Sequence, residues 1–168
     1  LAAQSVQATA PAVALKHDEL WVAGDAGALY HGVPLAGGSW GWTKSLGASK
    51  DTTWLSIQPE GSAVWLAGEA GALALATAGN ITPLDSGTSQ PLRCVRLKPT
   101  GGAFVVGGAG TWLEVEQGAA VINRSIKNLE VDLHGVAQVT GTWVAAGLPT
   151  TRIKPYLALP TITEPEDN

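Results

Sequence analysis

The chain has 168 residues, of which 45% are hydrophobic and 14% charged, a balance that is typical of a folded globular protein and excludes a disordered one. Ten basic against fourteen acidic side chains give a net charge of -4, which excludes the general attraction to phosphate backbones on which nucleic-acid binding depends. Glycine, proline or a charged residue interrupts every apolar stretch before the roughly 20 residues that a membrane-spanning helix requires.

The pattern divides the chain into three parts. Residues 1–11 form an N-terminal extension, residues 12–147 carry repeated units, and residues 148–168 form a Pro-rich C-terminal arm. The units span about residues 12–51, 52–90, 91–130 and 131–147 onward. The chain contains no Met and starts with LAAQSVQATAP, from which we expect a processed N-terminus and an extracytoplasmic location, periplasmic or secreted.

Four similar phrases recur along the repeated region. They read LWVAGDAGAL, VWLAGEAGAL, AFVVGGAGTW and, more loosely, TWVAAGLPT. Their apolar runs end at the anchor residues Gly24, Gly68, Gly107 and Ala146, which are 44, 39 and 39 residues apart. A period near 40 residues fits four-stranded propeller blades better than two-helix repeats.

Each unit is predicted to form four short strands joined by tight turns. An apolar segment precedes each phrase and ends in a turn, as in TTWLSIQPEGS, so that the two runs form a hairpin. GDAG and GEAG predict a second turn, in which Gly27 and Gly71 adopt positive φ. A third strand follows this turn, and more polar segments at residues 41–46, 80–87 and 119–126 supply the fourth.

The second strand of each unit is apolar at successive positions, so both of its faces should be covered, as they are between stacked sheets. A helix is the alternative for AGALALATAG. However, Gly68, Gly71 and Gly79 would each cost about 1 kcal/mol in a helix interior, and no N-cap precedes the stretch. We therefore predict an all-β fold, a β-propeller-like array of about four four-stranded antiparallel blades.

The repeated phrase has the pattern aromatic-hydrophobic-hydrophobic-Gly-Asp/Glu-x-Gly-x-Leu. A Pro-x-Gly turn precedes it, and a polar strand ending DSGT follows it. In this combination it resembles the repeats of the photosystem II assembly and stability factors. These belong to the bacterial-neuraminidase-repeat-like (BNR-like) propellers. The best matches are Trp65, Gly68, Glu69, Gly71 and Leu73, then Trp21, Gly24, Asp25, Gly27, Leu29 and His31. The resemblance covers about three quarters of the chain and implies a propeller fold with a role in protein assembly.

The chain departs from this group in two places. The Asp-box of sialidase-type repeats, Ser-x-Asp-x-Gly-x-Thr-Trp, is met nowhere, and SKDTTW and LDSGTS are only fragments of it. The fourth unit stops matching after Gly147. Since closed propellers usually carry four to eight blades, we expect an incomplete ring, whose remaining blades come from another chain or from further sequence.

The sequence offers no constellation of catalytic or metal-binding residues. His17, His31 and His134 lack the spacing of metal ligands, and neither a Gly-x-Ser-x-Gly elbow nor a phosphate-binding loop is present. The carboxylates expected in solvated turns are Asp25, Glu60 and Glu69. We therefore expect no enzyme activity, no metal and no cofactor.

The segment RCVRLK holds the most concentrated charge, and it leaves two interpretations open. On a strand, Arg96 and Lys98 would share a side with Cys94, while Arg93 and Val95 would point the other way. Cys94 is the single cysteine of the chain and is expected to pack as a small core residue. Salt bridges at a blade edge are the favoured interpretation. A site for an acidic partner is the alternative, which an arginine-rich surface in the resembling family implies.

The aromatic residues fall into two groups. One repeated position, expected to pack between blades, is occupied by Trp21, Trp65, Phe104 and Trp143. Trp40 and Trp42 have no repeat partner and are expected in the Gly-rich connection GGSWGWTK, where they either cover a blade edge or anchor a protein interface.

Four prolines, at positions 149, 155, 160 and 165, exclude a helix from the C-terminal arm. The arm includes the apolar run YLALP, so we expect it to lie across a neighbouring protein with Tyr156 as a contact residue. The favoured function is a non-catalytic scaffold or accessory subunit that binds other protein subunits, with membrane complexes reached only through a partner. The alternatives are a carbohydrate-binding or degenerate sialidase-like module, and a cleaved portion of a larger propeller enzyme.

Overall fold

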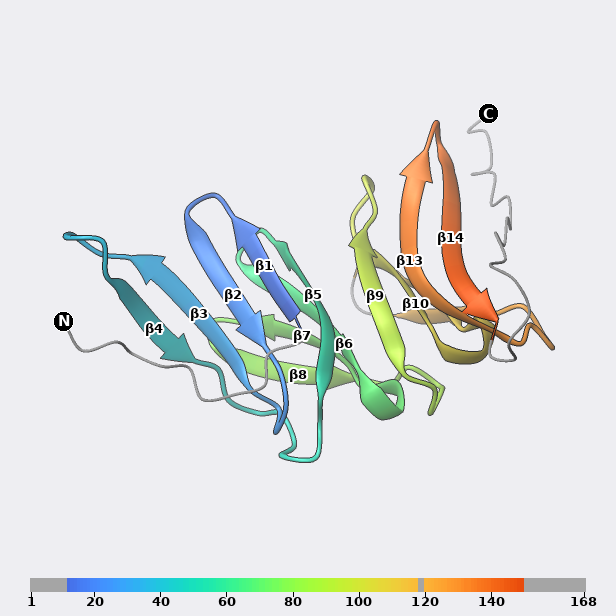
Figure 1. The fold of residues 1–168 in the computed structure, drawn as a ribbon, viewed down its shortest axis with the longest axis horizontal. Coiled ribbons are helices and arrows are strands. Elements are labelled where there is room, and N and C mark those ends of the chain that lie inside the picture. The colour runs from blue at the N-terminus through green and yellow to red at the C-terminus, as the bar shows by residue number, and fades with distance from the viewer. Residues whose placement is uncertain (1–11, 118–119, 150–168) are drawn as a thin grey trace.

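The computed structural model describes residues 12–117 and 120–149. These residues form fourteen strands in four antiparallel sheets, each of which follows chain order from its first strand to its last (Figure 1). The predicted all-β class is therefore confirmed. The predicted contact residue Tyr156, the extension at residues 1–11 and most of the arm lie outside the described residues.

The four sheets are numbered here in chain order. Sheet 1 contains β1 (Ala12–Lys16), β2 (Glu19–Ala23), β3 (Leu29–Pro34) and β4 (Trp40–Lys44). Sheet 2 contains β5 (Trp54–Glu60), β6 (Ala63–Gly68), β7 (Leu73–Thr77) and β8 (Asn80–Leu84). Sheet 3 contains β9 (Leu92–Leu97), β10 (Ala103–Gly107), β11 (Trp112–Val115) and β12 (Val121–Asn123). Sheet 4 contains β13 (Val131–Val139) and β14 (Thr142–Pro149).

Consecutive sheets pack face to face, and their first strands are neighbours. β1 contacts β5, β5 contacts β9, and β9 contacts β13. A separate apolar cluster fills each of the three junctions and includes Leu66 between sheets 1 and 2, Trp65 between sheets 2 and 3, and Phe104 between sheets 3 and 4. As predicted, the second strands β6 and β10 are covered on both faces, because almost every residue in them is buried.

The predicted second turn has the same geometry in three sheets. In sheet 1 the carbonyl of Asp25 accepts the N–H of Ala28 at 3.0 Å, and the two residues between them, Ala26 and Gly27, have φ of 52° and 65°. Positive φ at both central positions is the pattern of a type I′ hairpin turn. The short 3-10 turns η1 (Glu69–Gly71) and η2 (Gly108–Gly110) repeat it, which confirms the prediction of positive φ at Gly27 and Gly71.

A β-bulge explains the repeated glycine at the end of the second strand. In sheet 3, Leu92 pairs with Gly107 and Cys94 with Val106, so Arg93 is the extra residue. The backbone of β9 then comes so close that a Cβ on Gly107 would overlap the carbonyl oxygen of Pro91. The same clash is found at Gly68 in sheet 2 and at Gly147 in sheet 4.

The last anchor residue is therefore Gly147, and the sequence alignment on Ala146 was wrong by one position. Side chains alternate between the faces of a strand, so a shift of one residue exchanges the faces. Trp143 packs between two sheets as predicted, with its ring centroid 4.7 Å from that of Phe104 in sheet 3, but it lies on the face opposite to the one that Trp65 and Phe104 occupy in their own sheets. Val144, which pairs with Ala137, takes the place that Trp65 and Phe104 hold in their sheets.

Two further boundaries differ from the sequence expectation. Trp40 and Trp42 lie in the edge strand β4 and not in a connection, because Pro34 and Gly32 of β3 pair with them. β14 continues to Pro149, two residues beyond the end expected for the repeated region. Among the described residues, sheet 4 has two strands instead of the four expected in a unit.

Candidate functional sites

The predicted basic site is not a single patch, because each of its three side chains binds a different group of the same chain. Arg93 lies 3.4 Å from Asp132, Arg96 donates to Gln58 at 2.9 Å, and the ammonium of Lys98 lies 2.8 Å from Glu114. The bulge places Arg93 toward sheet 4, instead of on the side of Val95 as expected. The interpretation as salt bridges is therefore the one that the geometry favours for Arg93 and Lys98.

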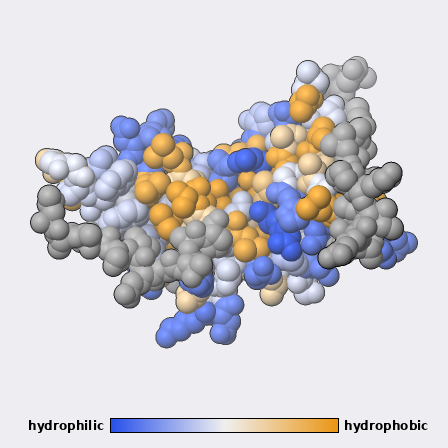
Figure 2. All heavy atoms as spheres, in the orientation of Figure 1, coloured by the Kyte–Doolittle hydropathy of each residue, from blue (hydrophilic) through white to orange (hydrophobic). Residues whose placement is uncertain are grey.

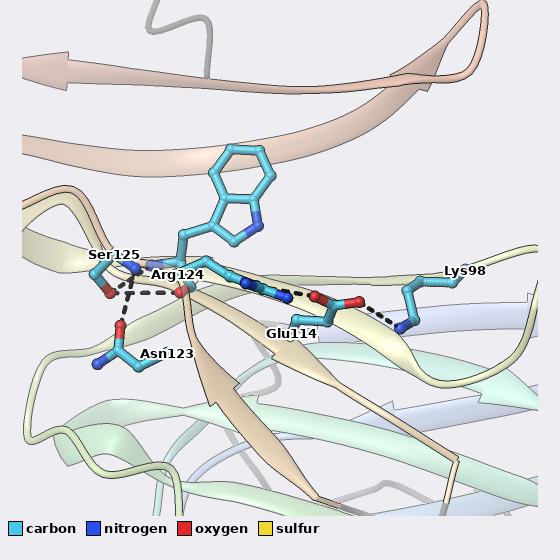
Figure 3. Close-up of polar contacts among 6 residues, drawn as sticks. Lys98, Glu114, Asn123, Arg124 and Ser125 are labelled. Atoms are coloured by element: carbon cyan, nitrogen blue, oxygen red, sulfur yellow. Dashed lines mark hydrogen bonds and ion pairs between the residues drawn. The ribbon is translucent and has the colours of Figure 1, made fainter. Parts of the chain in front are cut away.

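Glu114 is the centre of a polar network in sheet 3. Its two carboxylate oxygens accept from Lys98 and from Arg124, the latter at 3.1 Å (Figure 3). Burial by itself would raise the pKa of Glu114, but the hydrogen bonds and positive charges of Lys98 and Arg124 outweigh it and lower the pKa below its ordinary value. Lys98 also lies 5.5 Å from the centre of the Phe104 ring. The network holds the outer strands of sheet 3 together.

Trp40 and Trp42 stack on each other with ring centroids 6.1 Å apart. They belong to the outward face of sheet 1, the face that points away from sheet 2 and carries Val13, Leu15, Leu20 and Val22. Gly32 makes room for the second ring, since a Cβ there would lie 2.7 Å from Trp42. Leu20 pairs with Gly32 and so lies on the same face as Trp42. The two indoles thus extend an apolar face that no other described sheet covers.

The outward face of sheet 1 corresponds to faces that are buried elsewhere in the chain. Val13 of β1 pairs with Val22 of β2, and the same position in the first strand of the later sheets is held by Ile57, Val95 and Val136. Each of these three side chains is buried against the preceding sheet. In contrast, Val13 is 60% exposed and Leu15 69% exposed. Figure 2 shows hydrophobic residues gathered over β1 and β2. This surface, called here the outward face, has the composition of a packing surface without its partner sheet.

Beside the apolar cluster that joins sheets 1 and 2, a cleft of about 740 Å³ opens between the other face of sheet 1 and the hairpin turns of sheet 2. Trp21, His31 and Thr43 line it side by side, because they pair across β2, β3 and β4. The rings of Trp21 and His31 are stacked 3.9 Å apart, and Nε2 of His31 lies 2.9 Å from a carboxylate oxygen of Glu19. Hairpin turns of sheet 2, at residues 61–62 and 77–79, form the opposite wall.

Sequence reasoning missed this cleft, although it had singled out His31. The histidine lies within β3, and the turns that oppose it are about 30 to 50 residues away in the chain. The polar residue His31, at a position where sheet 2 has the apolar Leu75, was the available signal.

The predicted turn acids differ in their environment. Asp25 and Glu69 lie in turns, as expected. Glu60 instead ends β5 and accepts the indole N–H of Trp65 at 2.6 Å, so its role is to satisfy a buried donor. Within residues 12–117 and 120–149, no three His, Cys, Asp or Glu side chains converge as metal ligands would, and no helix is long and apolar enough to span a bilayer.

Comparison of the chain with models of known protein families and with curated proteins finds no match.

Proposed function

We propose that this chain is a non-catalytic scaffold or accessory subunit that binds other protein subunits within a larger complex. Its four sheets would be blades of an incomplete β-propeller. The observation that carries the proposal is the outward face, where Val13 and Leu15 are exposed although their counterparts in the following sheets are buried.

The partner that fits this face is a protein that presents the apolar face of another antiparallel sheet. Each equivalent face within the chain is covered by such a sheet. Val13 and Leu15 offer exposed aliphatic surface, and Trp40 offers an aromatic anchor of the kind that is enriched at interface hot spots. Burying a Val or Leu side chain contributes roughly 1.5 to 3 kcal/mol, so these few residues can supply much of a stable association. The resemblance to assembly and stability factors supports the same role.

Site-specific cross-linking in the source organism would test this proposal. A photoreactive amino acid at position 15 should capture one defined protein subunit, whereas the same group at Lys127, an exposed residue between sheets 3 and 4, should not. The variant Val13→Glu should abolish the adduct while the free energy of unfolding changes by no more than about 0.5 kcal/mol, because the side chain is exposed.

Three results would decide against the scaffold role. Equal labelling at positions 15 and 127 would show that the outward face has no specific partner. A stable monomer that forms no adduct at all would show the same. An adduct made only with sequence continuous with this chain would instead favour a portion of a larger propeller.

A further inference from the structure

The cleft between sheets 1 and 2 combines aromatic, carboxylate and hydroxyl groups in one place. Its volume of about 740 Å³ lies within the range of roughly 300 to 1,000 Å³ that small-molecule sites occupy. One wall is the row Trp21, His31 and Thr43, and the opposite wall consists of hairpin turns that include Thr77. The cleft lies on the opposite side of sheet 1 from the outward face, so its role is independent of the proposed docking of a partner.

The walls of the cleft are held at a defined separation. Nζ of Lys16, at the end of β1, donates to the carbonyl of Gly61 in sheet 2 at 3.0 Å. At the far side, Leu46 follows β4 and exchanges backbone hydrogen bonds with Gly79 and Ile81, at 2.8 Å and 2.7 Å. A ligand therefore meets a preformed site and need not order it, which favours affinity.

Ser45 is the feature of the cleft that points most directly to a ligand. The residue is only 5% exposed and lines the cleft, yet its hydroxyl group takes part in no hydrogen bond among the described residues. The oxygen is not among the buried atoms that lack a partner in the described part of the chain, so it is accessible from the cleft and can exchange a bond to water for one to a ligand. A ligand group that both donates and accepts would satisfy it.

The charges around the cleft restrict the class of ligand. Glu19 and His31 are the ionisable residues that line it, and they pair with each other. Lys16 borders the cleft through its bond to Gly61, and the carboxylate of Glu19 balances its charge, so the site has no surplus positive charge for a phosphate, sulfate or sialic acid carboxylate. Hydroxyl groups of Thr43, Ser45 and Thr77 donate and accept, as sugar hydroxyl groups do, and the remaining oxygen of Glu19 is an acceptor.

The repeat itself marks the cleft as exceptional. The junction between sheets 2 and 3 has Trp65 where sheet 1 has Trp21, but Leu75 where sheet 1 has His31. Leu75 packs against an apolar cluster, and Glu60 satisfies the indole of Trp65. If His31 served only to pack sheet 1 against sheet 2, an apolar residue such as the leucine of sheet 2 would serve equally well at its position.

We propose that this cleft binds a neutral saccharide, whose hydroxyl groups pair with Ser45, Thr43 and the Glu19 carboxylate, and whose ring lies against the stacked Trp21 and His31. The assignment concerns binding only, and no bond of the sugar is broken.

Titration of the ¹⁵N-labelled chain with a panel of sugars, followed by NMR, would test this site. The panel contains glucose, galactose, mannose and N-acetylglucosamine oligomers as neutral probes and sialyllactose as an anionic one. A neutral member should shift the resonances of Trp21 and Ser45. His31→Leu, which introduces the residue that sheet 2 carries, and Ser45→Ala should each weaken binding by about tenfold or more, as loss of a buried hydrogen bond does.

The matched control is Trp42→Ala, which removes an indole from the opposite face of the same sheet and should leave the affinity unchanged. Wild-type dispersion in the spectra of the three variants would establish that each is folded. No response to any neutral sugar at tens of millimolar would overturn the proposal, as would binding of sialyllactose alone. An equal loss of affinity in Trp42→Ala would also overturn it, because the binding site would then lie elsewhere.

Discussion

Replacing Gly107 by Ala isolates the effect of the β-bulge on stability. Its φ of -169° is extended backbone that Ala adopts without strain, so only the added methyl group matters. That carbon would lie 3.0 Å from Cα of Leu92 and closer still to the carbonyl oxygen of Pro91. Both neighbours are backbone, so β9 must move away from β10 by about 1 Å, an overpacking effect that costs roughly 1 to 3 kcal/mol.

The displacement would also break the hydrogen bond from the N–H of Gly108 to Pro91, which is 2.8 Å long and contributes about 1 kcal/mol. The total of roughly 2 to 4 kcal/mol corresponds to a melting temperature about 5 to 15 °C lower for a domain of this size. Urea denaturation followed by tryptophan fluorescence and circular dichroism would measure the loss in the free energy of unfolding. The matched control is Gly135→Ala in β13, where a Cβ has no heavy atom within 4 Å. A Gly107→Ala variant as stable as this control would refute the explanation of the repeated glycine.

Three other substitutions have expected outcomes. Glu114→Gln should lower the free energy of unfolding at pH 7 by about 1 to 3 kcal/mol, because it leaves Lys98 unpaired. The pKa of Glu114 is lowered in the folded state, so the difference from wild type should vanish as the pH falls through that pKa. Denaturation curves measured from pH 7 to pH 3 would show this. Trp65→Ala should cost about 3 to 5 kcal/mol in the same assay, because the side chain fills the junction of sheets 2 and 3. Ser86→Ala should cost about 1 to 2 kcal/mol, because its buried hydroxyl donates to the carbonyl of Gly71 at 2.7 Å, and hydrogen exchange should increase in that turn.

Local patterns in the sequence were sufficient to predict most of the strands and the second turn of the first two units. Short apolar runs separated by Gly-containing turns predict β-hairpins, since the glycines adopt backbone conformations that other residues avoid, and the positive φ of Gly27 and Gly71 confirms this. The steady spacing of the phrases predicted repeated antiparallel sheets, because each unit must bury its second strand between neighbours.

The faces of the strands could not be predicted as well. A bulge adds one residue to a strand, and no local signal distinguishes the extra residue from its neighbours. For this reason Arg93 was expected beside Val95 instead of near Asp132. Trp143 was placed at the repeat position that Val144 holds, because the last phrase was aligned on Ala146 instead of Gly147. Trp40 and Trp42 were expected in a connection because Gly-rich sequence masked their pairing with β3.

The sequence by itself thus determined the fold class, the repeat and the turn chemistry of this protein, all of which depend on residues close together in the chain. Only the tertiary structure decided which surfaces are available for binding. The outward face is defined by comparison with sheets that pack elsewhere, and the cleft beside His31 is closed by turns of the next sheet. Both depend on contacts between distant segments, and these are set by the packing of whole sheets and not by local preference.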